Sequence, residues 1–119
     1  MYITNFLTLQ NQLKIHHWQT TSYSEHVSLG KAYEDLEELI DNFVETSMGK
    51  YGKRLSSGGF KVELENYKDL NITDFLKQYD KYLSTELDAE LKEGDTELRN
   101  IRDDMKNVIN HTLYMLQLK

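Results

Sequence analysis

Hydrophobic residues recur at three- and four-residue steps in four stretches of the chain, which is the spacing of one buried face on an α-helix. The pattern predicts an all-α fold with four helices, at about residues 2–19, 25–48, 73–92 and 96–118. Short turns would join the first helix to the second and the third to the fourth. Ser24 and Asp95 are the predicted N-caps of the second and fourth helices.

The connection between the second and third predicted helices is about twenty residues long and carries no helical pattern. Glycines punctuate it, and its apolar residues alternate with charged ones from Phe60 to Leu64, which predicts a short strand or an extended crossing. Four helices with two short turns and one long crossover are typical of a four-helix bundle. We therefore treat residues 1–119 as one domain.

Two histidines flank the turn between the first two predicted helices, and an acidic pair lies further along the second one. His17 is near the end of the first helix, and His26 is near the start of the second. Asp41 and Glu45 are one turn apart on a shoulder of the apolar stripe, where an unpaired carboxylate would be costly to bury. Imidazole and carboxylate groups together suit iron, manganese or zinc.

The distance along the second helix decides how such a site could form. His26 and Asp41 are fifteen positions apart, and fifteen residues of α-helix span about 22 Å. Metal–ligand bonds are about 2.0–2.3 Å long, so one ion cannot touch both residues of one straight helix. Either the residues are unrelated, or an antiparallel pairing of two chains brings His26 of one copy near Asp41 and Glu45 of the other.

These residues resemble the pattern of the ferritin-like superfamily, and of its Dps-type miniferritins most closely. That pattern is His-Trp on the first helix, a second His at the start of the next helix, and Asp-x-x-x-Glu about fifteen residues on. Here His17-Trp18, His26, Asp41 and Glu45 match it. The stretch from His17 to His26, with the later Gly49 to Gly52, is also similar to short ferritin-like proteins of tailed phages. The resemblance covers about residues 10–52.

The resemblance implies a ferritin-like four-helix bundle with a long crossover between helices 2 and 3. It also implies a homodimer or a larger homo-oligomer, with a di-iron ferroxidase site shared across a two-fold interface. The residues expected to bind the metal are His17, His26, Asp41 and Glu45. Iron, in di-iron or mononuclear form, is the expected metal, with zinc or manganese as alternatives, and no catalytic residue is assigned beyond these ligands.

Three other residues are expected to support the ligands or to pack beside them, namely His16, Trp18 and Glu37. His16 is placed either facing solvent or behind a ligand. Trp18 is placed either at the end of the bundle or in the dimer contact. For His17 and His26 themselves, the alternative to metal binding is a pair of histidines that hydrogen-bond to Asp or to backbone carbonyls.

A second function stays open. Gly30 stands where the family has an acidic ligand one turn after the second His. The glycine favours a non-catalytic bundle with a structural, assembly or accessory role, which keeps the fold without the metal chemistry. Such a protein could be encoded by a phage. Whether the chain is an enzyme that oxidises Fe(II) is therefore left undecided.

Composition narrows the partners and the location. The formal net charge is −6, with seven acids against one Lys between Glu25 and Glu45. Nucleic acid is not an expected partner, because its backbone is recognised by Lys and Arg.

The chain has no Cys, so disulfides and thiolate metal sites are excluded. No apolar run approaches the roughly 20 residues of a membrane span, and the first ten residues lack signal-peptide features. We expect a cytoplasmic location, in the host if the chain is phage-encoded.

Overall fold

The computed structural model describes residues 2–118, and within them all regular structure is helical. The elements are α1 (Ile3–Gln19), α2 (Tyr23–Tyr51), the 3₁₀ turn η1 (Tyr67–Asp69), α3 (Ile72–Ser84), α4 (Glu86–Glu90) and α5 (Thr96–Leu116). The all-α prediction is confirmed. None of the helices in this part of the chain is both long enough and apolar enough to pass through a membrane.

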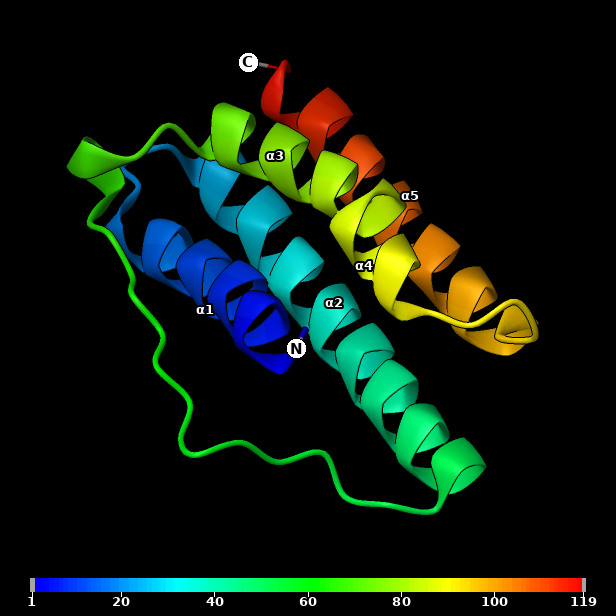
Figure 1. Cartoon of the computed structure of the whole chain (residues 1–119). Coiled ribbons are helices and arrows are strands. Elements are labelled where there is room, and N and C mark those ends of the chain that lie inside the picture. Colours follow the sequence, from blue (N-terminus) through cyan, green and yellow to red (C-terminus); the bar gives the residue numbers. More distant parts are fainter. Residues whose placement is uncertain (1, 119) are drawn as a thin grey trace.

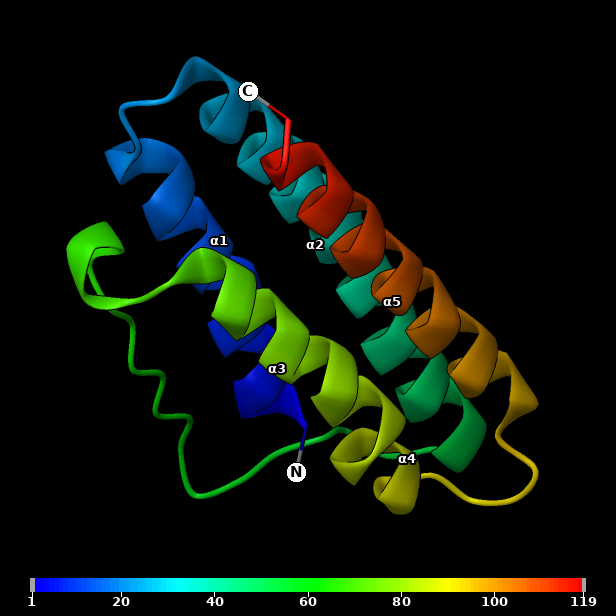
Figure 2. The same cartoon turned by 90° about the horizontal axis from the view of Figure 1, so that it is seen from above.

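The four longer helices pack around one core (Figures 1 and 2). α1 and α5 each contact both α2 and α3, which closes the set of four. α1 and α5 run in one direction, and α2 and α3 run in the opposite one. The start of α2 and the start of α3 therefore lie at the same end of the molecule, together with the turn between α1 and α2.

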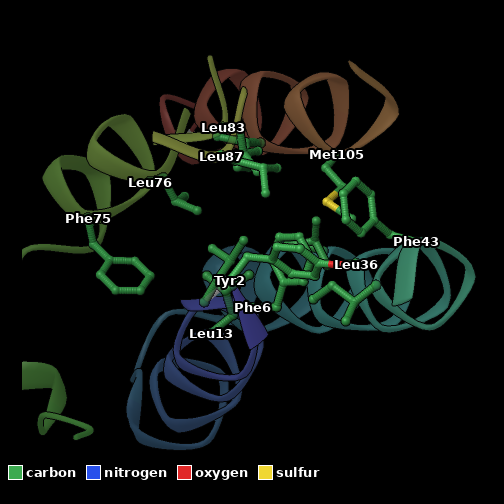
Figure 3. Packing of buried hydrophobic residues seen from close by; sticks show 14 of the residues in the cluster. Tyr2, Phe6, Leu13, Leu36, Phe43, Phe75, Leu76, Leu83, Leu87 and Met105 are labelled. Atoms are coloured by element: carbon green, nitrogen blue, oxygen red, sulfur yellow. The ribbon is translucent and has the colours of Figure 1, made fainter. Parts of the chain in front are cut away.

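The core combines a cluster of three aromatic rings, Tyr2, Phe6 and Phe43, with aliphatic residues along the helices, and Phe75 lies apart from this cluster (Figure 3). The Phe43 ring packs edge-on against the rings of both Tyr2 and Phe6, at centroid distances of 5.1 and 5.2 Å. Leu36, Leu83 and Met105 are fully buried beside them. Burial of such side chains contributes roughly 1.5–3 kcal/mol each relative to exposure, so this face of each helix fixes how the helices meet.

A long connection, residues 52–71, runs from the end of α2 back alongside α1 to the start of α3 (Figure 1). Of the two predicted forms, the extended crossing is the one observed. Its main anchor is Gln12 of α1, which is 1% exposed. The Gln12 Nε2 donates to the carbonyl O of Glu65 at 2.8 Å, and its Oε1 accepts from the Glu65 N–H at 2.8 Å.

The predicted boundaries of the second helix were wrong at its start. α2 begins at Tyr23 rather than near residue 25, and its N-cap is Ser22 rather than Ser24. The Ser22 side chain accepts the N–H of Glu25 at 3.3 Å, so the earlier serine satisfies a free amide of the first turn. The helix ends at Gly52, whose φ of 67° is the left-handed conformation that glycine adopts without strain.

The prediction of one continuous third helix, at about residues 73–92, was wrong. It breaks at Thr85 into α3 and α4. The Nη1 of Arg102 on α5 donates to the carbonyl O of Leu83 at 3.0 Å, so this carbonyl has a partner outside its own helix. Asp95 occupies the N-cap position of α5 as predicted, but its side chain makes no capping hydrogen bond there.

Candidate metal-binding site

The turn between α1 and α2 brings His17 and His26 together. Thr20 ends α1 and donates its N–H to the carbonyl O of His16 at 2.9 Å. Only residues 20–22 separate the two helices, so the last turn of α1 lies against the first turns of α2. The two imidazole rings stack face to face, with centroids 3.9 Å apart and planes 15° apart.

Each histidine of this pair binds the backbone of the other. The Nδ1 of His17 lies 2.6 Å from the carbonyl O of His26, and the Nδ1 of His26 lies 2.9 Å from the carbonyl O of His17. A carbonyl oxygen can only accept, so the proton is on Nδ1 in both rings. In the neutral ring, this leaves a lone pair on each Nε2.

The Nε2 atoms make no hydrogen bond within residues 2–118. His26 is exposed and His17 is partly exposed at the end of the bundle. The alternative of backbone-bonded histidines therefore describes the Nδ1 atoms, while both Nε2 atoms are left without a hydrogen bond in this part of the chain. A histidine that binds a metal through one nitrogen usually donates its other ring N–H to a carbonyl, a carboxylate or water, and this pair already has that arrangement.

Asp41 and Glu45 lie far from the histidines of the same chain. Both are exposed on α2, and the helix itself separates Asp41 from His26 by about 22 Å. The cost of burying an unpaired carboxylate does not arise in a single chain, because both residues are exposed. Within residues 2–118, nothing brings them to the turn.

No group of three or more His, Asp or Glu side chains in the described part of the chain is arranged to hold a metal ion. The structure thus brings His17 and His26 together and leaves Asp41 and Glu45 apart. A complete site of the predicted composition requires donors from a second copy, as the helix length already required.

The three expected supporting residues have different outcomes. His16 is fully buried, so the solvent-facing placement was wrong. Its Nε2 lies 3.1 Å from the carbonyl O of Leu70, and its Nδ1 lies 3.0 Å from the Nε2 of Gln12. Trp18 is 65% exposed, so it does not pack within the bundle, and its place in a dimer contact stays a prediction. Glu37 is exposed, and its supporting role stays a prediction.

Two glutamines of α1 were missed from the sequence, although they hold the crossover. Besides Gln12, Gln19 accepts the N–H of Tyr67 with its Oε1 at 2.7 Å and donates to the Oδ1 of Asn66 at 3.0 Å. Gln12 and His16 interrupt the buried side of an amphipathic helix with polar groups. Buried polar groups need partners, and that need was the signal that could have identified Gln12; Gln19 is exposed and gave no such signal.

A pocket of about 530 Å³ lies between the crossover and the start of α3. His16, Glu25 and Tyr67 line it, and the Tyr67 hydroxyl donates to the Oε1 of Glu25 at 2.9 Å. This hydrogen bond raises the pKa of Tyr67, and burial of the hydroxyl raises it further by a smaller amount. Neither His17 nor His26 lines the pocket, so it is a feature separate from the histidine pair.

Comparison with known proteins gives one family and no characterised relative. The searches of curated proteins and of solved structures returned no match. A family described as a family of unknown function, DUF5856, matches residues 17–116, which include all four predicted metal ligands, the last turn of α1 and all of α2, α3 and α5. The chain belongs to this family, DUF5856.

Proposed function

We propose that this chain binds a divalent transition metal, iron above all, at a site shared between two copies. His17 and His26 of one copy supply two Nε2 atoms, and Asp41 and Glu45 of a second copy supply carboxylate oxygens. One observation carries the proposal: both rings donate Nδ1–H to carbonyl oxygens, which fixes the tautomer and leaves Nε2 for a metal.

The arrangement of the helices supports a ferritin-like bundle as the setting of this site. The path of residues 52–71 along α1 places α2 and α3 in the same direction. A single long crossover in a four-helix bundle is the connection of ferritin-like folds, which bind metals with side chains that face one another from neighbouring helices.

The donor set suits Fe(II) as a substrate. Two imidazoles and two carboxylates are the mixed nitrogen and oxygen ligands that iron, manganese and zinc accept. In an oxidation of Fe(II), the carboxylates of Asp41 and Glu45 would stabilise the more highly charged Fe(III) product. His17 and His26 would hold the ion at the bundle end.

A second candidate function is a structural or assembly bundle without metal chemistry. The reciprocal hydrogen bonds of His17 and His26 favour it, because they also join α1 to α2 without any ion. Under this alternative the histidines serve only to close the turn, and the exposed carboxylates of Asp41 and Glu45 only add surface charge.

Metal binding to purified protein separates the two functions. Titration with Fe(II) without oxygen, and with Zn²⁺, should give at least one site per chain in the wild type. His26→Ala removes a nitrogen donor and should weaken binding by at least roughly 10–100-fold, since loss of a residue that only supports a ligand already costs this much. His111→Ala is the control, since His111 is an exposed histidine on α5 and should bind as the wild type does.

Aerobic oxidation of Fe(II), followed by absorbance, then separates an oxidase from a protein that only holds metal. A wild type that binds neither ion supports the structural bundle. A chain that binds metal tightly while it stays a strict monomer contradicts the shared site.

A further inference from the structure

Gly30 lies one turn after His26 on α2, and the His17 ring occupies the space beside it. A Cβ added at Gly30 would lie 2.7 Å from the Cε1 of His17 and 2.9 Å from its Nδ1. Real Cβ atoms do not approach other heavy atoms this closely. The position that the sequence pattern presented as a missing carboxylate is therefore filled by the partner ring of the histidine pair.

The His17 ring cannot simply move aside. Its Nδ1 bonds to the carbonyl O of His26, and its face stacks on the His26 ring. Any rotation that made room for a Cβ would break the 2.6 Å hydrogen bond and separate the rings. These are the two contacts that set the tautomer and the direction of Nε2.

A glycine inside a helix needs a specific reason, because only proline is less favourable there. Gly49, also in α2, shows the contrast. A Cβ at Gly49 would meet nothing within 4 Å. The chain thus offers two glycines on one helix, one against a ring and one open to solvent.

We infer that Gly30 is the positioning residue of the histidine pair: its missing side chain lets the His17 ring stack on His26 and orients both Nε2 atoms. The predicted effect of Gly30 on metal binding rests on the proposed function. The inference also assigns the half-site at the turn an all-imidazole character, with nitrogen donors and no carboxylate from the same chain. Such a half-site takes borderline ions such as Zn²⁺ and Fe(II) and discriminates against Mg²⁺.

Calorimetric titration with Zn²⁺ alone tests the inference on three proteins. Gly30→Ala should weaken Zn²⁺ binding by about 10–100-fold, the range for residues that orient metal-binding histidines. Gly49→Ala should bind as the wild type does. Mg²⁺ should not compete in any of the three. Equal Zn²⁺ affinity for Gly30→Ala and the wild type overturns the inference.

Nitrogen NMR of the imidazole rings in the metal-free proteins provides a readout that does not depend on binding. The wild type and Gly49→Ala should show His17 and His26 protonated at Nδ1, and Gly30→Ala should lose this for His17. If the wild type binds no Zn²⁺, the proposed function fails, and these ring signals still decide the role of Gly30. Unchanged His17 signals in Gly30→Ala overturn it.

A second substitution tests whether Gly30 acts through the ring. With His17→Ala in place, the steric conflict is gone, and Gly30→Ala should raise the Tm by a few degrees, as alanine in place of glycine does in an open helix. Gly49→Ala should raise it similarly in either background. A Tm lowered by Gly30→Ala even without the His17 ring overturns the inference.

Discussion

At the scale of single residues, the most consequential charged group is Asp95, which is 2% exposed at the start of α5. Its carboxylate pairs with the Nζ of Lys50 at 2.8 Å, accepts the hydroxyl of Tyr51, and accepts the N–H of Lys92 at 2.8 Å. Burial alone would raise the pKa of Asp95, but these three donors outweigh it and lower the pKa to about 2. The end of α2 is thereby joined to the start of α5.

The lowered pKa of Asp95 predicts loss of stability in acid. The carboxylate stabilises the fold fully above its unfolded pKa of about 3.9. Because its folded pKa is lower, this contribution is lost as the pH falls from about 4 to about 2. Asp95→Asn should therefore lower the free energy of unfolding by about 1–3 kcal/mol at pH 7, and the difference from the wild type should shrink below pH 4.

Urea unfolding at several pH values measures this difference. Asp103→Asn is the matched control, since that carboxylate is exposed and pairs, among residues 2–118, only with the neighbouring Arg102, and an exposed pair contributes about 0–1 kcal/mol. A difference between Asp95→Asn and the wild type that stays constant down to pH 2 would contradict the assignment.

Which single residues could be predicted depended on how far away their partners lie in the sequence. The pairing of His17 with His26 spans nine positions and follows from one short turn. His16 was placed wrongly because its partner Leu70 lies 54 positions away, at the end of a crossover whose path no local pattern predicts. Gly30 was interpreted as a missing ligand, because a sequence shows an absent side chain but not the ring that fills its space.

At the scale of elements, the crossover depends on α1. Residues 53–66 have no regular structure of their own, and side chains of α1 provide the hydrogen bonds that fix their far end. The backbone of Glu65 bonds to Gln12 in both directions, much as a neighbouring strand would. One side chain thus substitutes for a strand partner.

Gln12→Ala should therefore loosen the crossover more than it disturbs the helices. The loss of two buried hydrogen bonds, with the Glu65 backbone left unpaired, should cost about 1–3 kcal/mol of unfolding free energy. Trypsin should then cut faster after Lys61, which is exposed in this segment. Gln10→Ala, a partly exposed glutamine of the same helix, should change neither unfolding nor cleavage. Equal cleavage of Gln12→Ala and the wild type would show that other contacts hold the crossover.

The number and order of the long helices could be predicted from hydrophobic spacing, because each helix buries one continuous face. The break of α3 at Thr85 could not, since Leu83, Leu87 and Leu91 continue the four-residue step through it. No proline or glycine marks the break. The external partner of the Leu83 carbonyl, Arg102, is nineteen positions away on another helix.

At the scale of the whole molecule, the proposed pairing of two chains must overcome repulsion between the acidic residues of their α2 helices. In an antiparallel pairing that brings His26 near Asp41 and Glu45, the midpoint falls at about residues 34–35, and four acids lie at residues 34–38 of α2. Like charges at such a midpoint oppose association. A bound cation offsets this repulsion, so metal binding and pairing should strengthen each other through linkage.

Mixing two defective chains tests whether the site is shared. His26→Ala removes one imidazole, and Asp41→Asn with Glu45→Gln neutralises both carboxylates. Each variant alone should bind metal at least roughly 10–100-fold more weakly than the wild type. In a shared site, a mixed dimer has one intact site and one site that keeps only His17. Equal co-expression should then restore about a quarter of the wild-type sites, since about half of the dimers are mixed.

The restored sites should also keep the wild-type affinity for Zn²⁺ and Fe(II), because all their donors are native. A site built within one chain cannot be rescued this way, since neither variant chain carries a complete set of donors. Sedimentation of the mixture shows whether mixed dimers have formed. Mixed dimers without restored binding would contradict the shared site and leave His17 and His26 as a closure of the turn alone.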